Sequence, residues 1–219
     1  MMEAIDRYIA SNDWITGILL LALVCLVFSR GMFFNKFENF IILPFNNKYV
    51  VLYNKKGRLV SGFHIALSIF QVLNLALFIY LGGLAFAGEG RWGTLFLFPV
   101  ILGGLLAFTF LKIGIQLLGG YIFSSEKLAA SMVFSKLSYL NYSALLIFTA
   151  NLLLTYLLPG SRVVAGVGVF LLLAINAIGW ITVLKIHQKE IASHFFYFIL
   201  YLCALEIAPF LIISVALKA

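Results

Sequence analysis

The sequence predicts an all-α integral membrane protein with about six transmembrane helices and an amphipathic interfacial helix in its first cytoplasmic loop. Its 219 residues are 63% hydrophobic and only 11% charged, whereas soluble domains are roughly 45–50% apolar and about 25% charged. The charges lie in short clusters between apolar blocks of about 20 residues, the length that a helix needs to cross a bilayer. Because no stretch remains for a soluble domain, we expect residues 1–219 to form a single polytopic membrane domain.

Six apolar intervals are predicted to span the membrane. They are residues 14–28, 60–86, 92–118, 137–158, 163–184 and 191–217. Trp14 stands where an interfacial anchor is expected. The apolar pattern of the third interval continues to Phe123, which predicts a tilt, a kink at Pro99 or a break near Gly119. We expect residues 124–136 to form a second cytoplasmic connection, with another interfacial helix as a candidate within it.

The loop at residues 29–59 is long and strongly basic. Its basic residues are Arg30, Lys36, Lys48, Lys55, Lys56 and Arg58. Apolar side chains recur at helical spacing in its first part, which predicts an amphipathic helix in the headgroup plane. These apolar residues are Met32, Phe33, Phe37, Phe40 and Ile41. Residues 49–53 are predicted to be extended. The loop either docks anionic lipid headgroups or a partner, or simply lies against the cytoplasmic leaflet.

The distribution of basic residues predicts the orientation of the chain. If the 29–59 loop is cytoplasmic, eleven Lys and Arg residues lie on that side and four on the other. This asymmetry follows the positive-inside rule, so both termini are predicted to lie outside the cytoplasm. The net charge of +7 resides in loops beside the spans. We therefore expect the basic residues to meet the lipid bilayer and its anionic headgroups, and we expect no nucleic acid as a partner.

The last apolar interval carries Glu206 near its middle, followed by Pro209. A carboxyl group at that depth is costly and needs a reason, and a proline leaves one backbone carbonyl without its helical donor. At a rise of about 1.5 Å per residue, Gln71 and Asn74 of the second interval and Asn151 of the fourth lie at a similar depth. We therefore predict an intramembrane polar cluster made of these five residues.

Three interpretations of this polar cluster remain open. Its amides and a neutral carboxyl group could clamp helices together, at about 1 kcal/mol or less for each hydrogen bond. Glu206 could instead belong to a proton or ion pathway, since intramembrane carboxylates often mark relays. In the third interpretation, Glu206 faces a polar or basic group on a partner subunit.

No motif of a catalytic or cofactor site occurs in the sequence. HExxH, GxSxG, Walker and Gly-rich dinucleotide patterns are all missing from it. Cys25 and Cys203 lie in apolar intervals and are expected to be small buried side chains. His64 and His194 lie at equal depth near the cytoplasmic face and are the remaining candidates for a metal or haem site. A lone histidine there usually just forms a hydrogen bond, so we predict no enzyme, no metal and no cofactor.

One run of the last interval carries a family resemblance. The run FYFILYLCALEIAPF at residues 196–210 resembles the closing segment of an uncharacterised family of small polytopic inner-membrane proteins of Gram-negative bacteria, catalogued as a domain of unknown function. The likeness extends over most of the chain and includes Asn47, Lys48 and Tyr49 in the basic loop. It implies a location in the bacterial inner membrane and brings no established activity.

These features predict a non-enzymatic integral membrane protein that acts through helix packing with partner membrane proteins or within a homo-oligomer. The alternative is a small transporter or proton-coupled carrier that uses Glu206. Six spans without an evident internal repeat leave little for alternating access inside one chain, although an oligomer could supply it.

Overall fold

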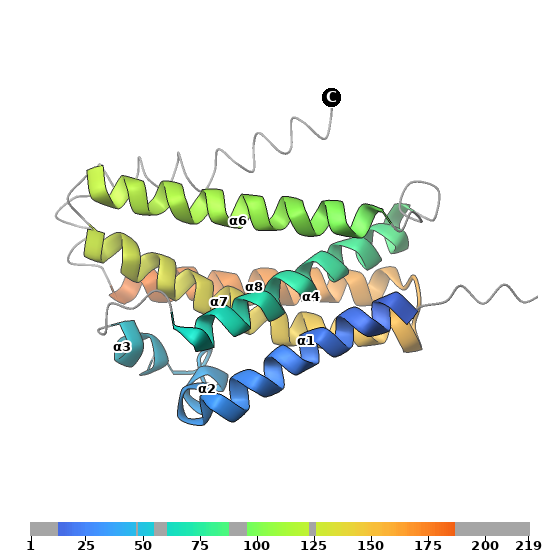
Figure 1. The fold of residues 1–219 in the computed structure, drawn as a ribbon, viewed down its shortest axis with the longest axis horizontal. Coiled ribbons are helices and arrows are strands. Elements are labelled where there is room, and N and C mark those ends of the chain that lie inside the picture. The colour runs from blue at the N-terminus through green and yellow to red at the C-terminus, as the bar shows by residue number, and fades with distance from the viewer. Residues whose placement is uncertain (1–12, 47, 55–60, 88–95, 123–125, 187–219) are drawn as a thin grey trace, which may run out of the picture.

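The computed structural model describes residues 13–46, 48–54, 61–87, 96–122 and 126–186, and Figure 1 shows their arrangement. The described chain is helical and contains no strand in these ranges. The elements are α1 (Asp13–Met32), α2 (Phe34–Ile41), α3 (Lys48–Asn54), α4 (Gly62–Ala87), α6 (Leu97–Ile122), α7 (Glu126–Leu152), a π-helical turn (Leu153–Leu157) and α8 (Arg162–Ile186).

Five helices of the described chain are long and apolar enough to cross a membrane. The spans are Asp13–Met32, Gly62–Phe86, Leu97–Ile122, Ala129–Leu157 and Arg162–Ile186. An α-helix satisfies its backbone polar groups internally, which is what a lipid environment requires of a spanning segment. Five apolar helices are compatible with the predicted multi-pass membrane protein. The sixth predicted span, at residues 191–217, lies outside the described residues.

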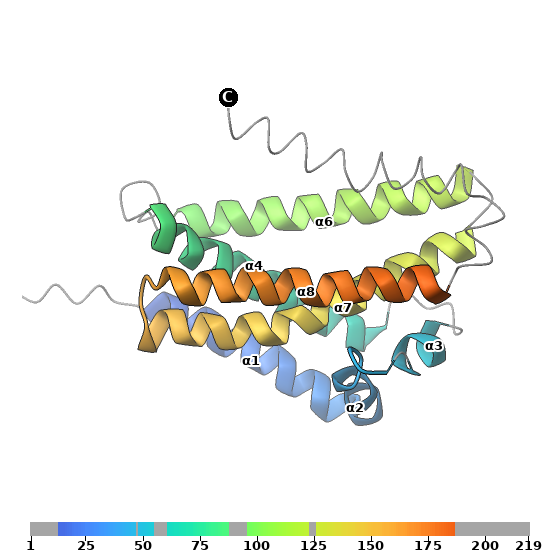
Figure 2. The same cartoon turned by 180° about the vertical axis from the view of Figure 1, so that it is seen from behind.

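Helix α4 is the centre of the bundle. It contacts α1, α6, α7 and α8, and Figures 1 and 2 show α1 and α6 on opposite sides of it. Of the residues in its membrane-spanning stretch, 56% are buried, compared with 6% of those in the spanning stretch of α6. Helix α4 therefore supplies much of the core, whereas α6 lies at the periphery and leaves most of its apolar side chains uncovered by the described chain.

Successive long helices run antiparallel to one another (Figure 1). The end of the bundle that carries α2 and α3 therefore also holds the C-terminal ends of α1, α6 and α8 and the N-terminal ends of α4 and α7. Arg30 and Lys185 stand in the last turns of α1 and α8 at this end. Arg162 begins α8 at the opposite end, where its Nε donates a hydrogen bond to the carbonyl of Ala85 at 3.1 Å. This bond satisfies one free carbonyl at the end of α4.

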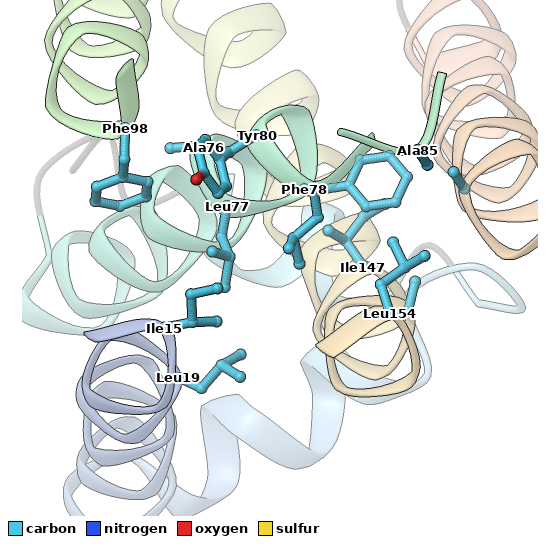
Figure 3. Close-up of a cluster of buried hydrophobic side chains, with 13 residues drawn as sticks. Ile15, Leu19, Ala76, Leu77, Phe78, Tyr80, Ala85, Phe98, Ile147 and Leu154 are labelled. Atoms are coloured by element: carbon cyan, nitrogen blue, oxygen red, sulfur yellow. The ribbon is translucent and has the colours of Figure 1, made fainter. Parts of the chain in front are cut away.

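The main hydrophobic cluster joins α1, α4, α6, α7 and the start of α8, and Figure 3 shows it. Its labelled members include Leu19 of α1, Leu77 of α4 and Ile147 of α7. At its edge the indole ring of Trp14 lies 5.2 Å from the ring of Tyr80. Such edge-to-face aromatic contacts add to the energy of apolar burial. Trp14, which the sequence predicts as an interfacial anchor, thus also packs against the protein.

Helix α8 approaches its neighbours closely at two glycines. A Cβ atom placed on Gly168 would lie 2.6 Å from Cζ of Phe78 in α4, and one on Gly179 would lie 2.7 Å from Cγ of Tyr139 in α7. Any larger residue at these positions would have to push the aromatic rings aside. Small residues at contact points allow apolar helices to pack backbone against side chain.

The basic loop is more helical than the sequence predicts. Helix α2 forms where an amphipathic helix was expected, but Phe37 and Phe40 are buried against protein in a cluster with α3, α4 and α7. The placement of α2 in the headgroup plane stays a prediction. The expected extended segment at residues 49–53 is wrong, because these residues form most of α3. Burial of Tyr49 and Val50 in the same cluster outweighs the local strand preference of aromatic and β-branched residues.

The third and fourth predicted spans have different limits in the structure. Helix α6 continues through Gly119 to Ile122, so the break, one of the three alternatives, does not occur. Pro99 lies in the first turn of α6, where a missing N–H group removes no helical bond. The expected connection at residues 124–136 is wrong from Glu126 onward, because α7 begins there. Ser135 and Ser138 are buried, and each hydroxyl donates to the carbonyl four residues earlier, at 2.9 and 2.8 Å. Serines satisfied in this way remain compatible with a buried helix.

Candidate functional site

Asn74 and Asn151, two members of the predicted polar cluster, lie in direct contact. The side-chain nitrogen of Asn151 donates to the backbone oxygen of Asn74 at 3.0 Å and to its Oδ1 at 3.4 Å. The side-chain nitrogen of Asn74 donates to the carbonyl of Phe70 at 2.8 Å. Both asparagines are at most 1% exposed. Helices α4 and α7 are thus joined by amide hydrogen bonds in an apolar surrounding, where an unpaired amide would be costly.

Gln71 lies one turn before Asn74 on α4 and is also buried, at 2% exposure. Its Oε1 accepts no hydrogen bond from the residues that the structure describes. The small space that it shares with Leu140, Ser143 and Ile147 contains no volume that a water molecule could occupy. The part of the polar layer between α4 and α7 is therefore dry and closely packed.

The remaining predicted members cannot be placed beside these amides. Glu206 and Pro209, together with the metal candidate His194, lie outside the described residues. The contact between Glu206 and the amides of α4 and α7 therefore stays a prediction.

His64 is held by aromatic side chains at the start of α4. Its Nε2 lies 3.0 Å from the hydroxyl oxygen of Tyr49 in α3, and its ring meets the ring of Phe134 edge to face, with the centroids 4.5 Å apart. The residue is 4% exposed, and its Nδ1 has no hydrogen-bond partner in the described part of the chain. Groups of three metal-ligand residues are not found among the described residues.

Tyr49 is the residue of this site that sequence reasoning missed. It is 1% exposed and packs against the rings of Phe40 and Phe134. Burial, with a further contribution from Tyr53, raises the pKa of the Tyr49 phenol above its ordinary value, so the hydroxyl stays protonated. The hydroxyl of Tyr49 and Nε2 of His64 thus share one buried hydrogen bond, whose donor is set by the imidazole tautomer. The spacing of aromatic residues on both sides of Pro44 could have indicated that Tyr49 is buried. The prediction of an extended segment at residues 49–53 concealed this signal.

The described basic residues of the 29–59 loop lie on or near the helices. Arg30 ends α1 and is exposed, and Lys36 of α2 places its ammonium group 5.1 Å from the ring centroid of Phe33. Lys48 begins α3, whereas Lys55, Lys56 and Arg58 lie outside the described residues. A cation held over an aromatic ring keeps its charge and still has a face open to anions. The contact of these residues with lipid headgroups stays a prediction.

The described part of the site consists of buried hydrogen bonds between helices. The Asn74–Asn151 pair is suited to fixing the register of two helices, and the Tyr49–His64 pair is suited to tying the α2–α3 segment to the bundle. The Asn74–Asn151 pair has no titratable group. The Tyr49–His64 pair sets a hydroxyl beside an imidazole, but both residues are buried, at 1% and 4% exposure.

The comparisons with known proteins place the chain in one family. No curated protein and no solved structure matches it. A family model described as "Domain of unknown function (DUF4271)" matches residues 15–217, which is nearly the whole chain. The resemblance to an uncharacterised family is thereby confirmed, and its further detail, a bacterial inner-membrane location, stays a prediction. The chain belongs to the DUF4271 family, a domain of unknown function.

Proposed function

We propose that this protein is a non-enzymatic component of the bacterial inner membrane that acts by packing against partner membrane proteins. The observation that carries the proposal is the exposure of α6. Within the part of the chain that the structure describes, only 6% of its membrane-spanning stretch is buried, although both α4 and α7 contact it. A helix this apolar needs either lipid or another helix over its outer face.

The outer surface of α6 also has room for a closely packed partner helix. Gly103, Gly104 and Ala107 are all exposed or half-buried along it. A Cβ atom on either glycine would meet no other atom within 4 Å. In membranes, small residues three or four positions apart let a second helix approach its partner closely. We therefore take the partner to be a transmembrane helix of another membrane protein.

The polar layer favours a clamp over a pathway. The amides of Asn74 and Asn151 bond to each other or to the backbone, and the space that Gln71 shares with Leu140 and Ser143 of α7 has no room for water. A proton or ion route needs hydrated or chained polar groups across the membrane. The alternative, a proton-coupled carrier, rests on Glu206. Replacing Glu206 by Gln keeps hydrogen bonding but removes the titratable carboxyl group. Under our proposal the Glu206→Gln variant therefore binds its partner membrane protein as the wild type does.

Bulky substitution of the small-residue surface tests the partner proposal. The tagged chain is expressed at its native level, extracted in mild detergent and purified with any stoichiometric membrane protein that accompanies it. We expect Gly103→Leu to lose that partner, because the larger side chain separates the two helices. Gly166→Leu is the matched control, since Gly166 of α8 is also exposed and a Cβ atom added there would meet no other atom within 4 Å.

Two outcomes contradict the proposal. One is that the wild-type chain purifies alone under these conditions. The other is that Gly103→Leu and Gly166→Leu retain the same partner equally. Mixing two differently tagged copies in one cell distinguishes a homo-oligomer from a complex with a different protein.

A further inference from the structure

A cavity of about 380 Å³ lies between α4, α6 and α7, in the half of the bundle near α3. Its walls are almost wholly aliphatic and phenyl groups, and none of its described lining residues is charged. The volume falls within the range of roughly 300–1,000 Å³ that is usual for small-molecule sites. Apolar cavities stay dry, and an empty cavity destabilises a protein in proportion to its volume. An apolar occupant would remove that cost.

The cavity opens on the apolar outside of the bundle. Ile65 and Ile69 of α4 and Leu106 and Phe110 of α6 line it, and Ile65, Ile69 and Phe110 are exposed on the surface, Phe110 at 72%. The mouth therefore lies between α4 and α6, within the segments long and apolar enough to span a membrane. In a bilayer this mouth faces hydrocarbon chains rather than water.

The cavity has no room for another helix. Helices α4, α6 and α7 all contact one another, and a helix with its side chains is roughly 10 Å wide. A helix of a partner, or a further segment of this chain, could cover the mouth but could not pass between helices that are already in contact. A single hydrocarbon chain is thin enough to enter.

Buried polar groups stand along the α4 wall of the cavity. His64 and Gln71 line it and are 4% and 2% exposed, and His64 Nδ1 and Gln71 Oε1 have no hydrogen-bond partner among the described residues. These two unpartnered atoms are buried within the wall, so the surface that faces the cavity is apolar. His64 stands in the first turn of α4, at the end of the span, and the wall continues to Val72, about 12 Å further along the helix axis.

We propose that this cavity binds one acyl chain of a membrane glycerolipid, which enters between α4 and α6. The ester end of the chain lies at the His64 end of the cavity, and the hydrocarbon runs along Ser68 and Val72 toward the centre of the bundle. The lining is mostly apolar and none of its described residues is charged, which matches an acyl chain and offers no cation for a phosphate. The inference rests on the membrane location proposed above.

Filling the cavity tests the inference. Ile113 and Ile115 lie two residues apart on α6; Ile113 lines the cavity, whereas Ile115 is exposed and does not. The full chain and its Ile113→Phe and Ile115→Phe variants are extracted from membranes and passed through the same detergent. Bound glycerolipid is then counted by native mass spectrometry. We expect the wild type and Ile115→Phe to retain lipid and Ile113→Phe to retain about tenfold less, because overpacking penalises the bound state.

A photoreactive side chain identifies the occupant directly. A diazirine-bearing aliphatic residue at position 113 should form its adduct with a lipid chain. An adduct with residues 191–217 or with another protein would overturn the inference, as would equal lipid retention in the two phenylalanine variants. Recovery of the wild-type chain in the soluble fraction would instead overturn the proposed membrane location. Lipid retention that depends on Ile113, without any protein partner, would leave the inference intact and contradict the partner proposal alone.

Discussion

Asn151 of α7 donates hydrogen bonds to two oxygen atoms of Asn74 in α4, the backbone carbonyl at 3.0 Å and the side-chain Oδ1 at 3.4 Å. The two residues are 77 positions apart in the chain. Their contact sets the register of the two helices that build most of the core. A hydrocarbon surrounding makes each lost partner costly, because no water can replace it.

Removing this contact should lower stability. We expect Asn151→Leu to destabilise the protein by about 1 kcal/mol, the scale measured for hydrogen bonds between membrane helices. Asn176→Leu is the control, because Asn176 is half-buried and its side-chain nitrogen donates to the carbonyl of Leu172 in its own helix at 2.7 Å. The measurement is thermal unfolding in one detergent. Equal midpoints for the two variants would show that the pair is not a clamp.

The glycines of α8 should differ in their tolerance of alanine. Gly179→Ala would place a Cβ 2.8 Å from Cβ of Tyr139, an atom that cannot move without its backbone. We expect a loss of about 1–3 kcal/mol, as is usual for overpacking. At Gly168 the obstacle is the far edge of the Phe78 ring, so the loss should be smaller.

The control for both glycine variants is Gly166→Ala, since Gly166 is exposed and a Cβ there meets nothing within 4 Å. This variant should be neutral or stabilising, because alanine favours a helix over glycine by about 1 kcal/mol. Thermal unfolding midpoints of the three variants rank their stabilities. A Gly179→Ala variant as stable as Gly166→Ala would contradict the close packing of α7 on α8.

The Tyr49 hydroxyl should make stability depend on alkaline pH. Burial raises the pKa of Tyr49 in the folded protein, whereas an unfolded tyrosine titrates near pH 10. Above that pH the unfolded chain releases its proton while the folded chain keeps it, so stability falls as pH rises. Tyr49→Phe should cost about 1 kcal/mol at pH 7 through the lost bond to His64.

Unfolding measured between pH 8 and 11 distinguishes the two effects of Tyr49. The Tyr49→Phe variant should be less stable at neutral pH and should lose less stability than the wild type as the pH rises through about 10. Tyr121→Phe is the control, because Tyr121 is 70% exposed. Parallel pH curves for the wild type and Tyr49→Phe would show that the phenol of Tyr49 is not buried in the folded protein.

Labelling of introduced cysteines tests the proposed orientation. In a background with Cys25 and Cys203 replaced by Ser, a membrane-impermeant thiol reagent should label Leu158→Cys from outside and leave Lys55→Cys unlabelled. Leu158 is 51% exposed in the turn before α8, at the end opposite α2 and α3. Permeabilised cells, in which both positions should react, provide the control. The reverse pattern would place the basic loop on the outside.

The sequence predicted the long helices well and the short ones poorly. Apolar length alone located α1, α4, α6 and α8 to within a few residues, because a span of lipid-like composition has few alternatives to a helix. It missed α3, where Tyr49 and Val50 are helical only through their burial against α4 and α7. It also placed the start of α7 too late, because Ser131, Ser135 and Ser138 resemble a polar connection until their neighbours are known.

Composition and the spacing of charges are enough to predict a helical, apolar chain suited to a membrane. The sequence also brought Asn74 and Asn151 to one depth, because the rise of a helix is constant. Which side chains at that depth meet depends on how the helices pack in three dimensions. This packing paired Asn74 with Asn151, paired His64 with Tyr49, and left a cavity beside His64 and Gln71. Such contacts depend on the rotation and separation of whole helices. The close packing at Gly168 and Gly179 sets this geometry for α8, and no local sequence pattern encodes it.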